Sequence, residues 1–277
     1  MSTAHPTTAT PRAVHPPAPE PRPTTTPSGA VRMVAVLGAR GGAGTSLLAA
    51  ALARALRRRS GAAALVDLDV PGGGLDVLLG IEDVRGARWP DLTHARGALD
   101  GDGLVAALPR WGAVPVLSGT RSADGQRAPD HGVVLDVTTA LLRSGHPVVL
   151  DVPRPSAWRE ATRALVSAAD AVVLVVPLTA PSVAGAVAST ALLDELGAGP
   201  VHVVPRRPAP GRVDTAGLEV ALARPVAATL GWDGRLAAAV ERGDGPRVGR
   251  RSPLGTTAAR LVELLDRRPV ATTGTGT

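Results

Sequence analysis

The sequence predicts an α/β fold in which a mainly parallel sheet carries helices on both faces. Short, fully apolar runs alternate with helical patterns along the chain, and several of these runs end in glycine or aspartate. Strands that are buried on both faces appear as continuous apolar runs, and helices provide the crossovers between parallel strands. Hydrophobic residues make up 44% of the 277 residues, which suits one domain with a sizeable core.

The expected elements follow one another in a regular order. Strands are expected at 31–37, 62–66, 114–117, 148–150, 171–176, 201–204 and 226–229, and helices at 47–59, 130–144, 156–168, 182–196, 213–223, 233–241 and 254–266. Residues 1–29 are rich in Pro, Thr and Ala, and residues 268–277 are similar. We expect both segments to be disordered tails around a domain at 30–267.

The composition excludes several classes of protein. There is no Phe, Tyr or Cys, and all 30 basic residues are arginine. The absence of cysteine rules out disulfides and thiolate chemistry. The start of the chain has no signal-peptide pattern, and the apolar run at 168–178 is too short to span a bilayer, so a cytoplasmic protein is expected.

The net positive charge and the high pI are weak evidence for a nucleic-acid partner. The net charge is +6 and the pI is about 11.3, but without Lys, Tyr or Cys almost nothing titrates between the α-amino group and arginine. Two groups of arginines are candidates for DNA phosphate contacts: Arg206, Arg207 and Arg212, or Arg247, Arg250 and Arg251. Solvated loop arginines are the simpler interpretation, and DNA binding stays an alternative.

A glycine-rich segment lies between the first strand and the first helix. It reads Gly38-Ala39-Arg40-Gly41-Gly42-Ala43-Gly44-Thr45-Ser46. Backbone N–H groups of such a loop close around phosphates, the helix N-terminus favours anions, and the Ser46 hydroxyl is a candidate Mg²⁺ ligand. Against the pattern G-x-x-x-x-G-K-[ST], Ala39 replaces the first glycine and Thr45 replaces the lysine. A strand-to-helix turn without a ligand is the alternative.

Carboxylates follow two of the expected strands. Asp67 and Asp69 end the second strand, and Asp151 ends a later one. The carboxyl ends of parallel strands meet at one edge of the sheet, beside the glycine loop. There Asp151 would bind Mg²⁺ through water, and Asp67 and Asp69 would position metal or attacking water.

These motifs together resemble the MinD/ParA superfamily of P-loop NTPases, whose phosphate loop reads K-G-G-x-G-K-[ST]. Arg40 falls at the signature lysine, and three glycines and Ser46 match. Asp67-Leu68-Asp69 is similar to switch I, and Asp151-Val152-Pro153 to Walker B and the start of switch II. The resemblance implies ATP and Mg²⁺ as cofactors and a homodimer.

A narrower resemblance is to the actinobacterial CpaE-like branch, related to TadZ and often called septum-site-determining. It rests on lysine-poor loops and on stretches similar to Ala107-Leu-Pro-Arg-Trp, Val116-Leu-Ser118, Gly245-Pro-Arg and Arg251-Ser-Pro-Leu254. It implies an ATP-binding localisation or assembly switch. The implied partners are Tad-type pilus or secretion ATPases or cell-division proteins, with recruitment to the membrane or cell pole through them.

The resemblance also implies roles for residues. Asp69 and Arg40 are the catalytic candidates, and Ser46, Asp67 and Asp151 are the metal candidates. The nucleotide-binding candidates are Gly38, Ala39, Arg40, Gly41, Gly42, Ala43, Gly44, Thr45, Ser46 and Leu47, with Pro205 and Arg206 near the adenine. Losing the phosphate-holding lysine at Thr45 removes a preorganised cation, which costs on the order of 10²–10³ in rate. We therefore expect weak or absent hydrolysis.

Two further interpretations differ from the switch. A non-hydrolysing scaffold that only binds partner proteins stays open. An NAD(P)-dependent dehydrogenase is excluded, because the Tyr-x-x-x-Lys pair of short-chain enzymes needs two residue types that the sequence lacks. The four tryptophans are expected to pack in the core, except Trp158, which is placed on a switch II surface.

Overall fold

The computed structural model describes residues 31–70, 74–121, 129–207 and 213–267. Within these ranges, seven strands form one sheet in the order β3-β4-β2-β5-β1-β6-β7. Every neighbouring pair is parallel except β3 and β4. The strands are β1 (Met33–Gly38), β2 (Ala64–Asp67), β3 (Arg110–Trp111), β4 (Val114–Leu117), β5 (Val148–Asp151), β6 (Ala171–Pro177) and β7 (Val201–Arg206). The predicted mainly parallel α/β fold is confirmed.

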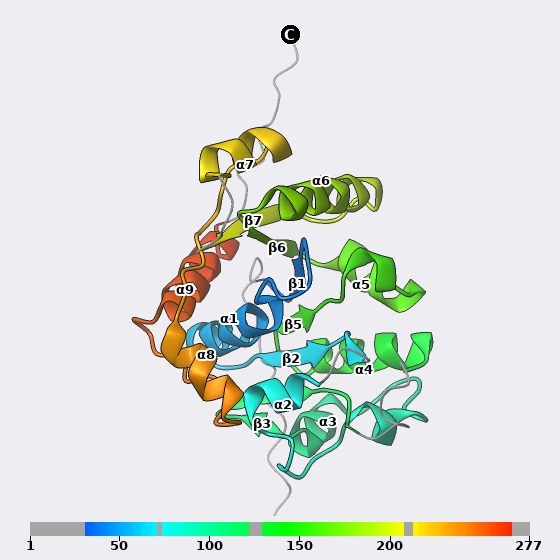
Figure 1. The fold of residues 1–277 in the computed structure, drawn as a ribbon. Helices are drawn as coiled ribbons and strands as arrows, with labels where there is room; N and C mark the ends of the chain where they lie inside the picture. The colour runs from blue at the N-terminus through cyan, green and yellow to red at the C-terminus, as the bar shows by residue number, and fades with distance from the viewer. Residues whose placement is uncertain (1–30, 71–73, 122–128, 208–212, 268–277) are drawn as a thin grey trace, which may run out of the picture.

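Helices cover both faces of the sheet. Figure 1 shows α1 and α9 on one face and α4, α5 and α6 on the other. The helices are α1 (Thr45–Ser60), α2 (Leu75–Leu79), α3 (Gly101–Ala107), α4 (His131–Arg143), α5 (Glu160–Ala168), α6 (Ala180–Glu195), α7 (Thr215–Leu222), α8 (Gly234–Glu241) and α9 (Pro253–Leu265), with 3₁₀ turns at Trp89–Leu92 and Pro155–Ala157.

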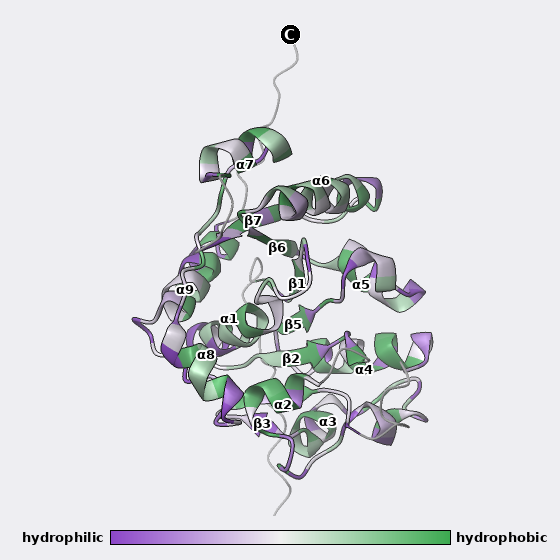
Figure 2. Ribbon diagram, in the orientation of Figure 1, coloured by the Kyte–Doolittle hydropathy of each residue, from purple (hydrophilic) through white to green (hydrophobic). Residues whose placement is uncertain are grey.

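The sheet divides the core into two layers, as the inner strand β1 shows. Met33, Ala35 and Leu37 pack into the cluster under α4, α5 and α6, whereas Val34 and Val36 pack into the cluster under α1 and α9. Side chains of a strand alternate between faces, so a run that is apolar throughout fits a strand covered on both sides. Figure 2 shows the hydrophobic strands between the two layers of helices.

Three short elements were not expected, and one expected strand is wrong. Helices α2 and α3 and strand β3 are too short to give a clear periodicity. Residues 226–229 form no strand. The segment runs beside β7 through isolated parallel bridges at Val226 and Leu230, and Pro225 before it has no backbone N–H for a ladder.

Candidate functional site

The glycine loop connects the buried end of β1 to the start of α1. Gly42 has a φ of 73° and Gly44 has a φ of 86°, in the left-handed region that glycine adopts without strain. Gly44 is the N-cap of α1, and no side chain caps the helix there. The first N–H groups of α1 therefore have no intrahelical partner and are available to an anion.

The loop closes tightly against the end of β1 at Gly38. A Cβ atom built on Gly38 would lie 2.5 Å from the Thr45 Oγ1 atom and 3.0 Å from the Arg40 carbonyl oxygen. Gly41 and Gly42 differ, because a Cβ at either position meets nothing within 4 Å. Thr45, at the position of the missing lysine, thus directs its hydroxyl toward Gly38.

Two buried carboxylates lie side by side at the ends of β2 and β5. Asp67 and Asp151 are register partners, and they are 2% and 4% exposed. Burial raises the pKa of Asp67 to about 7. Burial first, and then the charge of Asp67, raise the pKa of Asp151 well above its ordinary value. A pair of buried carboxylates without a cation prefers to hold protons, and a nearby cation would favour the charged form.

Ser46 joins the glycine loop to this pair. Its side chain interacts with the Asp151 carboxyl group, which opposes the rise in the pKa of Asp151. Asp69 is exposed. Partial desolvation of its carboxyl group raises its pKa, while the charge of Arg154 lowers it. The predicted meeting of the loop with the strand-end carboxylates is thus present in the fold.

The hydrogen bonds of Asp67 differ from those of Asp151. The Oδ1 atom of Asp67 accepts the backbone N–H of Asp69 at 2.9 Å, and its Oδ2 atom accepts that of Leu75 at 3.3 Å. Its backbone carbonyl accepts the Trp89 indole N–H at 2.7 Å. Asp67 therefore holds the turn after β2, whereas Asp151 faces the glycine loop.

A cavity of about 410 Å³ opens above the glycine loop. Most of the predicted site residues line it: Gly38, Arg40, Gly41, Gly42, Ala43, Gly44, Thr45, Ser46, Leu47, Asp69, Asp151 and Arg206. Ala39, Asp67 and Pro205 do not line it. Ala39 donates its N–H to Val175, and Pro205 is buried with its carbonyl accepting the N–H of Leu230.

The far wall of the cavity comes from residues that the sequence did not indicate. Leu230, Trp232 and the α8 residue Leu236 line it. Trp232 is 55% exposed, so the expectation that it packs in the core is wrong. Arg154 also lines the cavity, and its position three residues after Asp151 was the signal available for it.

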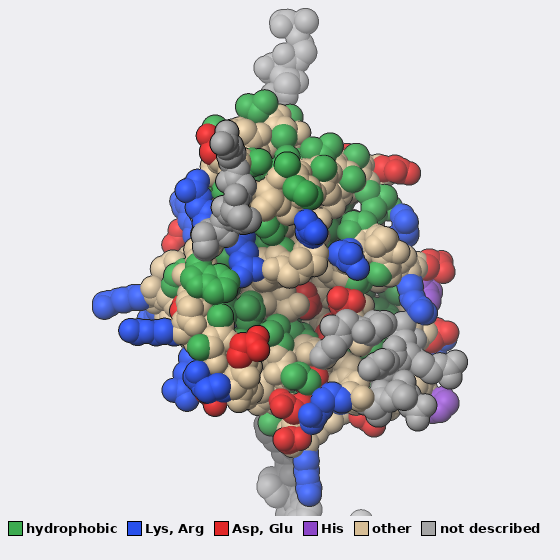
Figure 3. All heavy atoms as spheres, in the orientation of Figure 1, with side chains coloured by type: hydrophobic (Ala, Val, Ile, Leu, Met, Phe, Trp, Pro, Cys, Tyr) green, Lys and Arg blue, Asp and Glu red, His purple; other side chains and the backbone are tan. Residues whose placement is uncertain are grey.

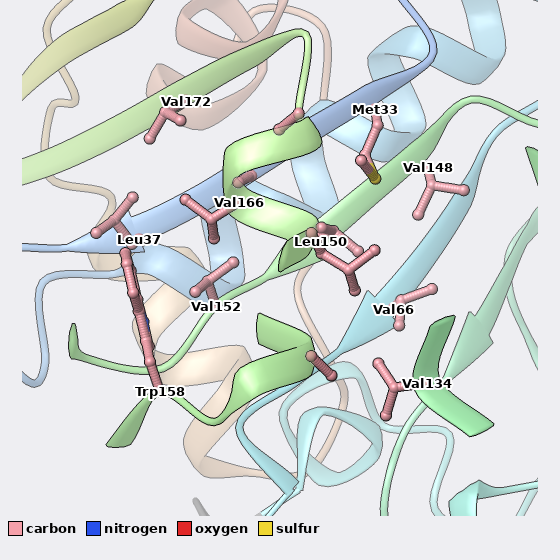
Figure 4. Packing of buried hydrophobic residues seen from close by; sticks show 14 of the residues in the cluster. Met33, Leu37, Val66, Val134, Val148, Leu150, Val152, Trp158, Val166 and Val172 are labelled. Atoms are coloured by element: carbon pink, nitrogen blue, oxygen red, sulfur yellow. The ribbon is translucent and has the colours of Figure 1, made fainter. Parts of the chain in front are cut away.

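The remaining tryptophans are buried, including Trp158, which was expected on a switch II surface. Trp158 is 8% exposed, and Figure 4 shows its ring beside Leu37 in the core. Its indole N–H donates to the Pro153 carbonyl at 2.7 Å. The Trp158 side chain thus fixes the segment after Asp151 to the core.

A second, larger hollow of about 1380 Å³ adjoins the first. It shares Gly41, Gly42, Ser46 and Asp69 with the first cavity and extends over the segments after β2 and β5 to the start of α4. Figure 3 shows carboxylate and arginine side chains near one another at the middle of one face of the molecule. The glycine loop is therefore open on two sides.

The arginines proposed for DNA contacts differ in their surroundings. Arg206 lines the cavity, and Arg207 donates to the Thr215 hydroxyl at 3.2 Å. Arg212 lies outside the described residues. Arg247, Arg250 and Arg251 are exposed, which agrees with solvated loop residues as well as with phosphate contacts.

A glycine loop between β1 and α1, beside carboxylates that end neighbouring parallel strands, defines a P-loop NTPase fold of the MinD/ParA type. Solved structures share this fold at low sequence identity. A ParA family ATPase from Chlorobium tepidum TLS is 19% identical with a TM-score of 0.72, over 85% of this chain and 98% of that one. The septum site-determining protein MinD with Mg-ADP from Pyrococcus horikoshii OT3 is 16% identical with a TM-score of 0.69, over 85% and 96%.

Sequence comparison gives nearer relatives without an assigned activity. An uncharacterized protein of Mycobacterium tuberculosis, from two strains, is 41% identical over 235 residues, which are 85% of this chain and 64% of the relative. The chain thus spans less than two thirds of the length of these relatives. No protein-family model matches the chain. In the described part of the chain, no helix is both long and apolar enough to cross a membrane.

Proposed function

We propose that this chain is an ATP-binding switch of the MinD/ParA type, in which Mg²⁺ and nucleotide are held at the glycine loop and hydrolysis is weak. The observation that carries the proposal is that Ser46 and the buried Asp151 meet at the edge of the cavity, where the Ser46 side chain opposes the rise in the pKa of the carboxyl group. A hydroxyl and a carboxylate in this relation are hard oxygen ligands of the kind that Mg²⁺ uses together with phosphate oxygens.

The residues present fit the nucleotide in most respects. The uncapped start of α1 offers backbone N–H groups, the open space above Gly41 and Gly42 admits phosphates, and Asp151 supplies a charge that favours a cation. Among the described residues, no three His, Asp or Glu side chains form a metal site by themselves. Mg²⁺ would accordingly take part of its ligands from the nucleotide, where it would neutralise phosphate charge.

Weak hydrolysis follows from Thr45, which places no charge at the lysine position. Backbone N–H groups and Mg²⁺ hold the ground state, but a preorganised cation is what stabilises developing charge on the phosphoryl oxygens. In this proposal the bound nucleotide controls dimerisation and partner binding. The partners are pilus or secretion machinery of the Tad type or cell-division proteins. A MinC:MinD cell division complex from Aquifex aeolicus has this fold, with a TM-score of 0.68 at 18% identity over 84% of this chain.

Calorimetry with Mg-ATP tests the binding part of the proposal. Wild type should bind, and Ser46→Ala and Asp151→Ala should each bind roughly ten-fold or more weakly, because each removes a contact to a charged group. Ser60→Ala is the matched control, since Ser60 ends the same helix and contacts only the Leu56 and Ala62 carbonyls. Equal affinity in all four proteins would contradict the proposed site.

The oligomeric state in the presence and absence of nucleotide distinguishes a switch from a scaffold that only binds partner proteins. A switch should sediment as a dimer with Mg-ATP and as a monomer with Mg-ADP or without nucleotide. A scaffold should show one state under all three conditions. A sedimentation coefficient that does not respond to nucleotide, in a protein that binds no ATP, would favour the scaffold.

A further inference from the structure

Arg206 reaches from the end of β7 to the glycine loop. Its Nη1 atom donates a hydrogen bond to the Gly42 carbonyl at 2.7 Å, across a sequence separation of 164 residues. The same atom lies 3.1 Å from the position of a Cβ on Gly44. The guanidinium group therefore lies directly against the bend of the loop, where a side chain at residue 44 would displace it.

The guanidinium group is held in place by Trp232. Its Cζ atom lies 5.5 Å from the centroid of the Trp232 ring, a distance at which the aromatic face attracts a cation. Partial burial lowers the pKa of Arg206, but a guanidinium group stays charged at physiological pH. Trp232 thus fixes the orientation of a charge that has lost part of its hydration.

Within the described part of the chain, no carboxylate balances the charge of Arg206. In the described ranges, no Asp or Glu oxygen forms an ion pair with it, whereas the buried Arg88 has Asp76 at 3.7 Å. The other arginines that line the cavity, Arg40 and Arg154, are exposed. Arg206 is accordingly the cavity-lining cation, among those described, that is both partly buried and unbalanced.

We propose that Arg206 supplies, from β7, a positive charge that helps to bind the nucleotide phosphates, where Thr45 supplies none from the loop. This inference rests on the proposed nucleotide site. Arginine suits the position because it has five N–H donors in a planar fork. Nη1 remains on the Gly42 carbonyl and holds the loop, while the other N–H groups are available to phosphate oxygens. A lysine has no fork with which to do both.

The test is equilibrium binding of two probes, Mg-ATP and inorganic tripolyphosphate, to wild type and Arg206→Ala. We expect Arg206→Ala to weaken both by a similar factor, roughly 10- to 100-fold, because a contact to a charged group is lost. Arg207→Ala is the matched control: it removes the same charge from the next residue, which is exposed and bonded to Thr215. It should bind both probes as wild type does.

The two probes separate phosphate contact from base contact. Unchanged tripolyphosphate binding with weakened ATP binding would place Arg206 at the base and overturn the inference. Unchanged binding of both probes would overturn it while leaving the proposed function intact. A wild type that binds neither probe would remove the proposed function and this inference together.

A rescue variant tests whether Arg206→Ala weakens binding only because it disorders the glycine loop. Thr45→Lys in the Arg206→Ala background returns a cation to the loop from the other side and should recover most of the lost affinity for tripolyphosphate. Arg206→Lys, which keeps the charge but not the fork, should bind with intermediate affinity. Failure of both to improve on Arg206→Ala would assign Arg206 a purely structural role and contradict the inference.

Discussion

At the scale of the residue, Asp151 combines burial, a neighbouring carboxylate and a hydroxyl donor. The unfolded chain titrates Asp near 3.9, whereas burial and mutual repulsion raise the pKa of both Asp67 and Asp151, that of Asp67 to about 7. Between about pH 4 and pH 7 the native state thus holds protons that the unfolded state releases, so the stability of the nucleotide-free protein should fall as the pH rises through this window.

Replacing one of the pair should remove this penalty. Asp151→Asn, without nucleotide, should melt above wild type at pH 7.5, by about 2–4 °C for each kcal/mol of relieved burial cost, and the difference should vanish near pH 4. Thermal melts at the two pH values measure this. Asp83→Asn is the control, because its side chain is 92% exposed. A variant that melts below wild type at pH 7.5 would contradict the pKa directions.

Thr45 is the residue on which turnover depends. Wild type should hydrolyse ATP near background, and Thr45→Lys should raise the steady-state rate, because Gly44, Ser46 and Asp151 already line the same cavity. The gain should be partial, since Ala39 also departs from the family loop and the space beside Gly38 is tight: a Cβ built there would lie 2.5 Å from Thr45 Oγ1. Phosphate release measures it. Wild-type turnover equal to that of an ordinary member of the superfamily would show that Arg40 or Arg206 already does what the lysine does.

At the scale of the element, the turn from β1 to α1 depends on close packing at one glycine. Gly38→Ala would place a methyl group 2.5 Å from Thr45 Oγ1 and 3.0 Å from a backbone oxygen. Overpacking of this kind costs about 1–3 kcal/mol, so the thermal midpoint should fall by several degrees. Gly41→Ala is the matched control, because its methyl group meets nothing, and should melt within about a degree of wild type. Equal midpoints would show that the turn is looser than described.

The same element shows what the sequence can predict. Local patterns predict the glycine loop, α1 and the carboxylates at 67, 69 and 151. In each case an apolar run is followed directly in the chain by glycine or by aspartate. The wall formed by Arg206, Trp232 and Leu236 does not follow from such patterns. Arg206 meets Gly42 only after residues 164 positions apart are folded together, and no local pattern distinguishes an exposed Trp232 from a buried one.

At the scale of the whole molecule, the cavity is assembled from segments across the chain. The loop after β1, the end of β5, the end of β7 and helix α8 all contribute to it. The central strands β5, β1 and β6 are neighbours in the sheet, so their carboxyl ends bring these segments to one edge, as in other open parallel sheets. A ligand that binds there should therefore order several distant segments at once.

Hydrogen–deuterium exchange with and without Mg-ATP tests the central claim, that nucleotide binds at the glycine loop. Backbone N–H groups of residues 41–47 have no intrahelical partner and should become protected when they donate to phosphates. We predict slowed exchange in peptides covering 41–47, with smaller protection at 230–237, and weaker protection in Ser46→Ala at an ATP concentration that half-saturates wild type. Unchanged exchange at 41–47 under saturating Mg-ATP, or protection confined to another part of the molecule, would contradict the account.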